Sequence, residues 1–183
     1  RDTHKYQLKP EPDIHFTSVT TYISKFFEEF DSEKIATNLV RNNPKYSNYT
    51  VDSLISEWNA AAEYGTIIHN EIENWIRYGI EPKEPKAKVG KEWIDEYRAK
   101  SDIDVLSEII LYSKELKIAG TIDVLAKDNQ SDEYVLIDWK TSKKITTVSY
   151  KYKTGNHDAT KNVMDCNFYH YSLQMSLYRY ILE

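Results

Sequence analysis

Two acidic residues and a lysine lie in neighbouring apolar stretches of the chain, at a spacing that could bring them together. Asp123 follows Gly120-Thr121-Ile122, and one residue separates Asp138 from Lys140. Side chains two apart on a β-strand share a face, so Asp138 and Lys140 should point the same way. If the two stretches pair, Asp123 lies beside Asp138. Such carboxylate oxygens suit Mg²⁺ or Mn²⁺, and a lysine beside the metal can orient or deprotonate a water.

An Asp-x-Lys pair alone is more often a solvated strand end than a functional group. Asp138 differs because the four residues 134–137 before it are apolar and Trp139 follows it. That context places its carboxylate in a predicted core strand, where an uncompensated charge is costly. A bound metal would compensate the charge.

The sequence predicts that the acids are carried on three consecutive strands. Residues 118–126 and 134–141 are rich in β-branched and aromatic side chains and are separated by polar turn formers, so we expect antiparallel pairing. A preceding strand, residues 105–112, contains Glu108. Glu108, Asp123 and Asp138 are spaced by about 15 residues each, as adjacent strands of similar length would give. The pattern therefore predicts a meander with three neighbouring acids.

A long helix should carry a further candidate ligand. Its apolar residues recur every three or four positions from Thr50, a predicted N-cap, to just before Gly79, where a left-handed residue is tolerated. Gly65 on the buried face suggests close approach by another element. His69 lies at the edge of that face. A histidine there is usually a packing residue, but a nearby acidic cluster that needs further ligands favours a metal-binding role.

The remaining pattern predicts the overall organisation. Helices are expected near residues 18–30, 31–41, 88–100 and 167–183, and residues 81–88 should form a surface connection. Residues 1–14 are polar and contain two prolines, so we expect an extended or flexible arm. The length and the 40% hydrophobic composition fit a single domain over residues 1–183. The expected class is α/β (α+β), a mixed sheet flanked by helices.

Basic and polar residues near the C-terminal end could bind a polyanion. A solvated loop explains the segment after Lys140 equally well, but lysines beside a metal site could follow a phosphate backbone. In the last helix, Gln174 and Tyr178 are neighbours one turn apart, although ordinary helix surface is the simpler interpretation. The lysines considered are Lys143, Lys144, Lys151 and Lys153.

Composition excludes several classes of site and protein. A single cysteine, Cys166, rules out an intrachain disulfide, a tetrathiolate zinc site and a four-cysteine iron–sulfur cluster. The net charge of −5, from 24 basic and 29 acidic residues, argues against a basic nucleic-acid-binding coat but not against a local basic groove. The sequence has no transmembrane-length apolar run, no signal-peptide pattern and no P-loop.

Five segments, in order, resemble the motifs of the PD-(D/E)XK nuclease superfamily, and most closely its RecB-like exonuclease branch. The likeness runs from about Ser18 to the C-terminus, with isoleucine at position 122 where the superfamily's name has proline. It implies a restriction-endonuclease-like core whose antiparallel meander carries the acids. The segments are Gly65-Thr66-Ile67-Ile68-His69, Glu108, Gly120-Thr121-Ile122-Asp123, Asp138-Trp139-Lys140-Thr141 and Gln174-Met175-Ser176-Leu177-Tyr178.

The resemblance also implies a role for each of these residues. The ligands of Mg²⁺ or Mn²⁺ would be His69, Asp123, Asp138, Glu108 and the Trp139 carbonyl group, with no iron–sulfur cluster. The catalytic group would be Lys140, which activates the attacking water, together with Asp123, Asp138 and Glu108. Contacts with DNA would come from Gln174 and Tyr178 and from the basic segment with Lys143, Lys144, Lys151 and Lys153.

The implied activity is that of a divalent-metal-dependent deoxyribonuclease, an exonuclease that hydrolyses single-stranded DNA ends in repair, recombination or replication. A structure- or sequence-specific endonuclease on the same fold is one alternative, and a nucleic-acid-binding module without cleavage is another. Any ATP-driven movement on DNA would come from a helicase or other replication or repair protein in a separate chain. We expect a soluble intracellular protein with no membrane partner, in the cytoplasm of a bacterial or phage-infected cell, or in the mitochondrial matrix if a targeting segment has been removed.

Overall fold

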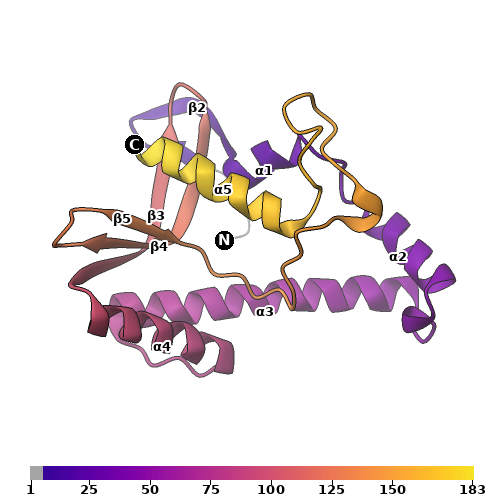
Figure 1. The fold of residues 1–183 in the computed structure, drawn as a ribbon, viewed down its shortest axis with the longest axis horizontal. Helices are drawn as coiled ribbons and strands as arrows, with labels where there is room; N and C mark the ends of the chain where they lie inside the picture. The colour runs from indigo at the N-terminus through magenta and orange to yellow at the C-terminus, as the bar shows by residue number, and fades with distance from the viewer. Residues whose placement is uncertain (1–5) are drawn as a thin grey trace.

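A five-stranded mixed sheet forms the centre of the computed structural model, which describes residues 6–183 (Figure 1). The strand order is β1-β2-β4-β3, and β5 also pairs with β4. The β3–β4 and β4–β5 pairs are antiparallel, as the predicted meander requires, while β2 runs parallel to β4. The strands are β1 (Tyr6–Leu8), β2 (Glu11–Ser18), β3 (Ile103–Ser113), β4 (Ile118–Asp128) and β5 (Tyr134–Ile137).

Helices flank this sheet, so the expectation of a mixed α and β protein with flanking helices is confirmed. None of the helices within residues 6–183 is long and apolar enough to cross a membrane. The α-helices are α1 (Val19–Ser24), α2 (Ser32–Asn42), α3 (Val51–Tyr78), α4 (Pro85–Lys100) and α5 (Asn167–Leu182), and two short 3₁₀ turns are η1 (Pro44–Tyr46) and η2 (Tyr150–Tyr152).

Two hydrophobic clusters meet on β4 and thereby position Asp123. The first cluster packs α1 and α5 against β3 and β4, and it includes Ile122. The second packs α3 and α4 against the next part of β4, and it includes Val124. Asp123 therefore lies at the point where β4 passes from one cluster to the other. In Figure 1, α5 passes in front of β3 and β4, and α3 runs below the sheet.

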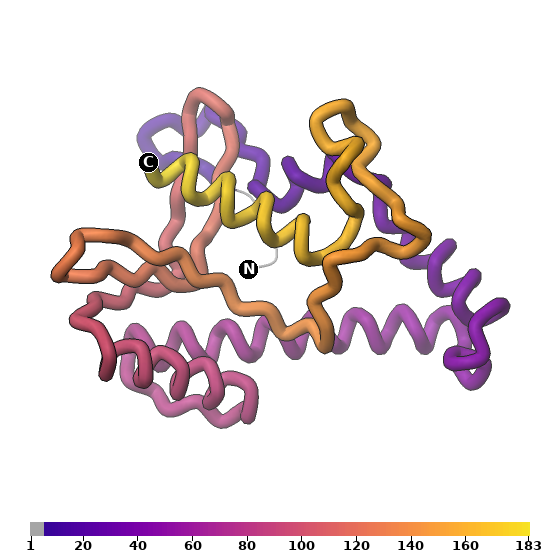
Figure 2. Tube along the Cα trace, viewed as in Figure 1, coloured from indigo at the N-terminus to yellow at the C-terminus, as the bar shows by residue number. Residues whose placement is uncertain are grey.

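The long connection from β5 to α5, residues 138–166, runs from the sheet past α3 and back to the start of α5 (Figure 2). Its middle is attached to the segment after α1. Asn156 donates its backbone N–H to the Phe26 carbonyl oxygen at 3.0 Å and its side-chain amide to the Phe27 carbonyl oxygen at 3.0 Å. Thr160 Oγ1 also donates to the Phe26 carbonyl oxygen, at 2.9 Å. These carbonyl groups are thus hydrogen-bonded to the connection instead of continuing a helix.

Several predicted boundaries are wrong. The first helix ends at Ser24 rather than near residue 30. Just after Ser24, the carbonyl groups of Phe26 and Phe27 accept the hydrogen bonds from the connection described above. The helix expected from residue 88 begins at Pro85, whose fixed φ suits the first helical position. The strand expected over residues 134–141 ends at Ile137, before the Asp-x-Lys pair.

The N-terminal segment is also more ordered than the sequence indicated. Residues 6–18, most of which were expected to form an arm, build an antiparallel β1–β2 hairpin whose second strand joins β4. The first five residues of the predicted arm lie outside the described part of the chain. The hairpin brings Tyr6 to the edge of the site described below, where its hydroxyl group hydrogen-bonds with Thr121 Oγ1 at 3.2 Å.

Candidate active site

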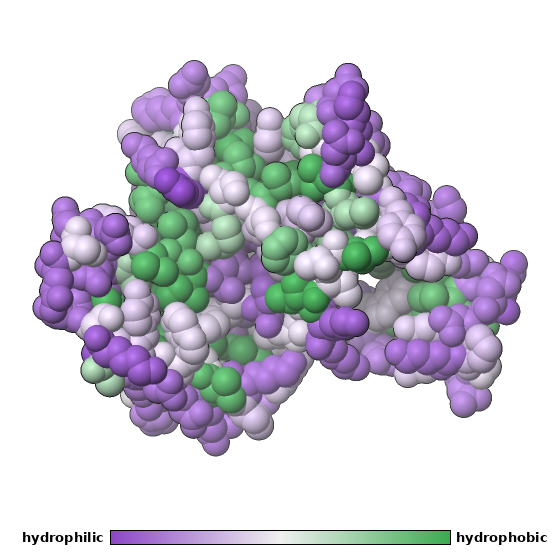
Figure 3. All heavy atoms as spheres, viewed as in Figure 1, coloured by the Kyte–Doolittle hydropathy of each residue, from purple (hydrophilic) through white to green (hydrophobic). Residues whose placement is uncertain are grey.

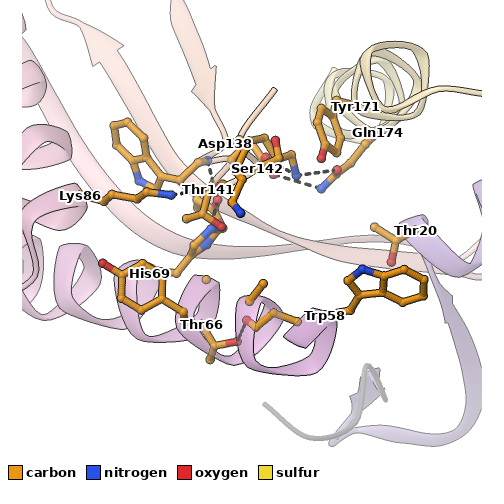
Figure 4. Close-up of a pocket in the computed structure, with 18 of the residues that line it drawn as sticks. Thr20, Trp58, Thr66, His69, Lys86, Asp138, Thr141, Ser142, Tyr171 and Gln174 are labelled. Atoms are coloured by element: carbon orange, nitrogen blue, oxygen red, sulfur yellow. Dashed lines mark hydrogen bonds and ion pairs between the residues drawn. The ribbon is translucent and has the colours of Figure 1, made fainter. Parts of the chain in front are cut away.

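A cavity of about 1310 Å³ lies between α3, the ends of β4 and β5, and α5. Figure 3 shows the hollow near the middle of one face of the molecule, with hydrophilic side chains inside it. In Figure 4, His69 and Trp58 project toward the cavity from α3, while Tyr171 and Gln174 face them from α5. The motif residues that the sequence singled out on α3, β4 and α5 therefore meet at one place.

Asp123 is fixed by contacts from two other elements. Its Oδ2 atom accepts a hydrogen bond from the Trp139 backbone N–H at 2.8 Å and lies 3.2 Å from Nδ1 of His69. The Trp139 side chain packs on the other side, against the cluster formed by α3 and α4. The turn of chain after β5 is thus anchored by a core tryptophan, and this anchor holds its two neighbours, Asp138 and Lys140, toward the cavity.

Asp138 is the most buried charged group of the site, with 8% of its side chain exposed. Burial raises the pKa of this carboxyl group, and the nearby charge of Asp123 raises it further, against the opposing effect of Lys140. Oδ1 accepts a hydrogen bond from Gln174 Nε2 at 3.0 Å. Oδ2 lies 2.5 Å from Lys140 Nζ, but no group in the described chain hydrogen-bonds to it with good alignment.

Lys140 lies between the acidic pair and α5, with its ammonium group at the cavity wall. In addition to its contact with Asp138, Nζ donates to Gln174 Oε1 at 3.2 Å and lies 4.4 Å from the ring centroid of Tyr171. The Lys140 side chain is 24% exposed. The ammonium group is therefore held in a defined position while it keeps access to the cavity.

Gln174 and Tyr178 support the site from α5. The amide group of Gln174 also donates to the Tyr178 hydroxyl oxygen at 3.1 Å, so it links three polar groups of the site. Burial raises the pKa of Tyr178 to about 12, so this hydroxyl group, which is protonated at neutral pH in any case, stays protonated further into the alkaline range. The Tyr178 ring lies so close to β4 that a Cβ at Gly120 would be 2.4 Å from its Cε1 atom. Both residues are buried, so the structure gives them a supporting position rather than a surface one.

Glu108 lines the same cavity, but the backbone there departs from a regular strand. Its φ of 53° is a left-handed value that costs a non-glycine residue of the order of 1–3 kcal/mol. Ladder pairing skips this position, passing from Ser107 opposite Val124 to Ile109 opposite Ile122. Arg77, in the last turn of α3, stabilises the kink by donating to the Ser107 carbonyl oxygen at 3.0 Å and to its Oγ at 3.2 Å.

The lysines of the basic segment divide into two groups. Lys143 and Lys144 line the cavity, as a role in binding a polyanion requires. Lys151 and Lys153 are not among the residues that line it. Lys153 Nζ instead forms an ion pair with Glu28 at 2.5 Å, and Lys151 lies over the ring of Tyr150. Of the four lysines expected to contact DNA, Lys143 and Lys144 thus lie at the cavity, and the chain turns away after residue 144.

The residues fit a divalent cation in part. Two ligands about 2.1 Å from an octahedral metal and at right angles lie about 3.0 Å apart, close to the 3.2 Å between His69 Nδ1 and Asp123 Oδ2. The buried Asp138 Oδ2 atom, which lacks an aligned hydrogen bond, is a further oxygen donor. With the side chains as they stand, however, no three His, Cys, Asp or Glu residues within positions 6–183 are gathered as a metal centre. Metal binding would require Asp138 Oδ2 to exchange its contact with Lys140 for the cation.

Sequence reasoning missed several residues of the cavity wall. Lys86 reaches in from α4 and donates to the Thr141 carbonyl oxygen at 2.9 Å, next to Lys140. Aromatic side chains from α3, from η1 and the turn after it, and from α5 also line the cavity. Only Tyr171 gave a usable signal, because it lies one helical turn before Gln174. The aromatic lining residues missed are Tyr46, Tyr49, Trp58, Tyr64 and Tyr171.

Comparisons with known proteins add no further information: neither protein-family models, nor curated proteins, nor solved structures gave a match.

Proposed function

We propose that this protein is a divalent-metal-dependent deoxyribonuclease of the RecB-like PD-(D/E)XK type, with a restriction-endonuclease-like core, that removes nucleotides from single-stranded DNA ends. The observation that carries the proposal is the buried Asp138 carboxylate. It is held against a lysine, beside a second carboxylate and a histidine, at the wall of an open cavity. Burying two carboxylates side by side is unfavourable unless a cation compensates them, so such an arrangement favours a functional site.

His69, Asp123 and Asp138 would hold Mg²⁺ or Mn²⁺, with Glu108 and the Trp139 carbonyl group as the remaining expected ligands. The cation supplies charge neutralisation at the phosphate and at the leaving oxygen. The Lys140 ammonium group would orient the attacking water by donating a hydrogen bond to its oxygen, and would stabilise the hydroxide that forms as the water's proton passes to solvent. Gln174 keeps Lys140 and Asp138 at a fixed separation, since its amide group hydrogen-bonds to both.

The lining of the cavity favours an unpaired strand as substrate. Exposed rings can stack on any base, and lysines attract the phosphate backbone. Both kinds of side chain line the wall, although the chain as a whole is acidic. The lysines concerned are Lys45, Lys86, Lys143 and Lys144. This combination of charge and aromatic surface suits a single-stranded nucleic acid, and the resemblance of the motifs to those of deoxyribonucleases makes DNA the substrate that we propose.

The proposal is tested by incubating single- and double-stranded oligonucleotides, labelled at either end, with Mg²⁺, Mn²⁺ or EDTA. We expect a ladder that shortens from one end of the single strand, only when the metal is present. The Lys140→Ala variant should lack this activity, whereas the matched control Lys100→Ala should retain it, because Lys100 is 73% exposed on α4 and does not line the cavity.

Other products would identify other functions on the same site. Internal cuts would indicate an endonuclease. Binding without products, unchanged in Lys140→Ala, would indicate a nucleic-acid-binding module. If wild-type protein neither binds nor cleaves DNA with either metal, the proposed function is wrong.

A further inference from the structure

Tyr171 holds a position next to Lys140 that none of the expected site residues provides. Its ring centroid lies 4.4 Å from Lys140 Nζ, well within the range of a cation–π contact. Tyr171, Gln174 and Tyr178 lie on one face of α5, and Figure 4 shows the first two of them directed at the Asp138 region. Gln174 and Tyr178 act through hydrogen bonds, whereas Tyr171 meets the ammonium group with its ring.

The role of this ring follows from the competition for the Lys140 ammonium group. Within residues 6–183, three groups contact Nζ: the carboxylate of Asp138 at 2.5 Å, the amide oxygen of Gln174 at 3.2 Å and the Tyr171 ring. A cation bound by Asp138 would take the carboxylate away from Lys140. Only the amide oxygen and the ring would then fix the ammonium group, so the ring contributes most when the site is loaded.

We propose that Tyr171 is a positioning residue that holds the Lys140 ammonium group at the cavity wall through the face of its ring. The inference rests on the proposed nuclease function for its kinetic consequence, but the contact itself is independent of that function. The attraction depends on the electrons of the ring and not on the hydroxyl group. Phenylalanine at position 171 should therefore suffice, whereas a leucine of similar bulk should not.

The contact can be observed without any activity. Protons above an aromatic ring resonate upfield, so in protein labelled with ¹³C at the lysine ε-carbon the Lys140 signal should lie upfield of the other lysines. The signal is assigned by its loss in Lys140→Arg. We expect the upfield position to persist with Mg²⁺ added and in Tyr171→Phe, and to disappear in Tyr171→Leu.

The kinetic consequence is measured on the single-stranded oligonucleotide. We expect Tyr171→Leu to lower kcat by about tenfold, which corresponds to about 1.4 kcal/mol, with KM and the Mn²⁺ Kd unchanged. Tyr171→Phe should keep the wild-type kcat. The matched control is Tyr180→Leu on the same helix, since Tyr180 is 66% exposed and lies away from the cavity lining.

A series that preserves the fold separates the ring's electrons from its shape. Phenylalanine analogues with one, two and three ring fluorines at position 171 should lower kcat stepwise, because each fluorine weakens the attraction for a cation while the ring still packs. A kcat that is independent of fluorination, or an unshifted Lys140 signal in a wild-type protein that cleaves DNA, overturns the inference. A wild-type protein with the shifted signal but no cleavage refutes the nuclease function and leaves the contact established.

Discussion

Gly120→Ala should disturb the site through Tyr178, although position 120 carries no functional group. A Cβ at this position would lie 2.4 Å from Tyr178 Cε1 and 3.0 Å from its hydroxyl oxygen. Real carbon atoms do not approach so closely, so the ring must move. Tyr178 is only 4% exposed and is enclosed by the cluster that joins α1 and α5 to the sheet, which leaves it little room.

The magnitude follows from two opposing effects. Overpacking in a well-filled core costs about 1–3 kcal/mol. Alanine also restricts the unfolded chain, which stabilises the folded state by about 0.4–1 kcal/mol because Gly120 lies in a strand and not in the left-handed region. The expected result is a free energy of unfolding lower by about 1–2 kcal/mol, which corresponds to a Tm lower by about 2–8 °C for a chain of this size.

The assay is urea denaturation followed by far-UV circular dichroism, repeated in a Tyr178→Leu background. Once the ring has been removed, alanine at position 120 has no ring edge to displace, so its destabilising effect should vanish or change sign. The coupling between the two substitutions is the measured quantity. If Gly120→Ala has the same effect in both backgrounds, the Tyr178 ring does not lie against Gly120 as described.

The remaining predictions concern the polar residues of the site. Lys140→Ala should preserve the Tm and the Mn²⁺ affinity but lower the cleavage rate by about 10²- to 10⁴-fold, and wild-type rates at saturating Mn²⁺ would contradict its catalytic role. Asp138→Asn should abolish cleavage and raise the Tm of the metal-free protein at neutral pH. Burial raises the pKa of the Asp138 carboxyl group in the folded state, so its ionised form opposes folding above that pKa. The effect disappears below the pKa that the group has in the unfolded chain, so the difference in Tm between the variant and the wild type should shrink toward acidic pH. A difference in Tm that stays constant or reverses would refute this. His69→Ala should remove most of a preference for Mn²⁺ over Mg²⁺ in calorimetric titrations, because an imidazole nitrogen favours transition metals; a preference that survives would show that His69 is not a ligand.

Local signals in the sequence were sufficient for the elements that carry the motifs. Thr50 caps α3 as predicted, accepting a hydrogen bond from the Ser53 backbone N–H at 3.1 Å. Gly79 ends the same helix with a φ of 69°, a value that glycine adopts without strain. Gly65 has the expected close neighbour, since a Cβ there would lie 2.9 Å from Thr141 Oγ1. In each case the structure depends either on a contact between residues close in the sequence or on a glycine, whose lack of a side chain allows the observed backbone conformation or close approach.

Contacts between distant segments could not be predicted in this way. β2 pairs with β4, which lies about a hundred residues later in the chain. The N-terminal strands also lack the strong alternation of polar and apolar residues from which a strand can be predicted. The Asp-x-Lys pair lies beyond the end of β5, so the shared direction of Asp138 and Lys140 comes from the Trp139 anchor and not from strand alternation. Nor does any local pattern show that Lys153 pairs with Glu28, which lies 125 residues earlier in the chain.

Anomalous diffraction from crystals grown with Mn²⁺ can show whether His69, Asp123 and Asp138 form a divalent-metal centre. We expect a manganese peak about 2.1 Å from His69 Nδ1 and from a carboxylate oxygen of each aspartate, with Lys140 Nζ no longer paired to Asp138 Oδ2. A map at saturating Mn²⁺ without a peak at this position, in which the His69–Asp123 and Asp138–Lys140 pairs stay intact, would contradict it.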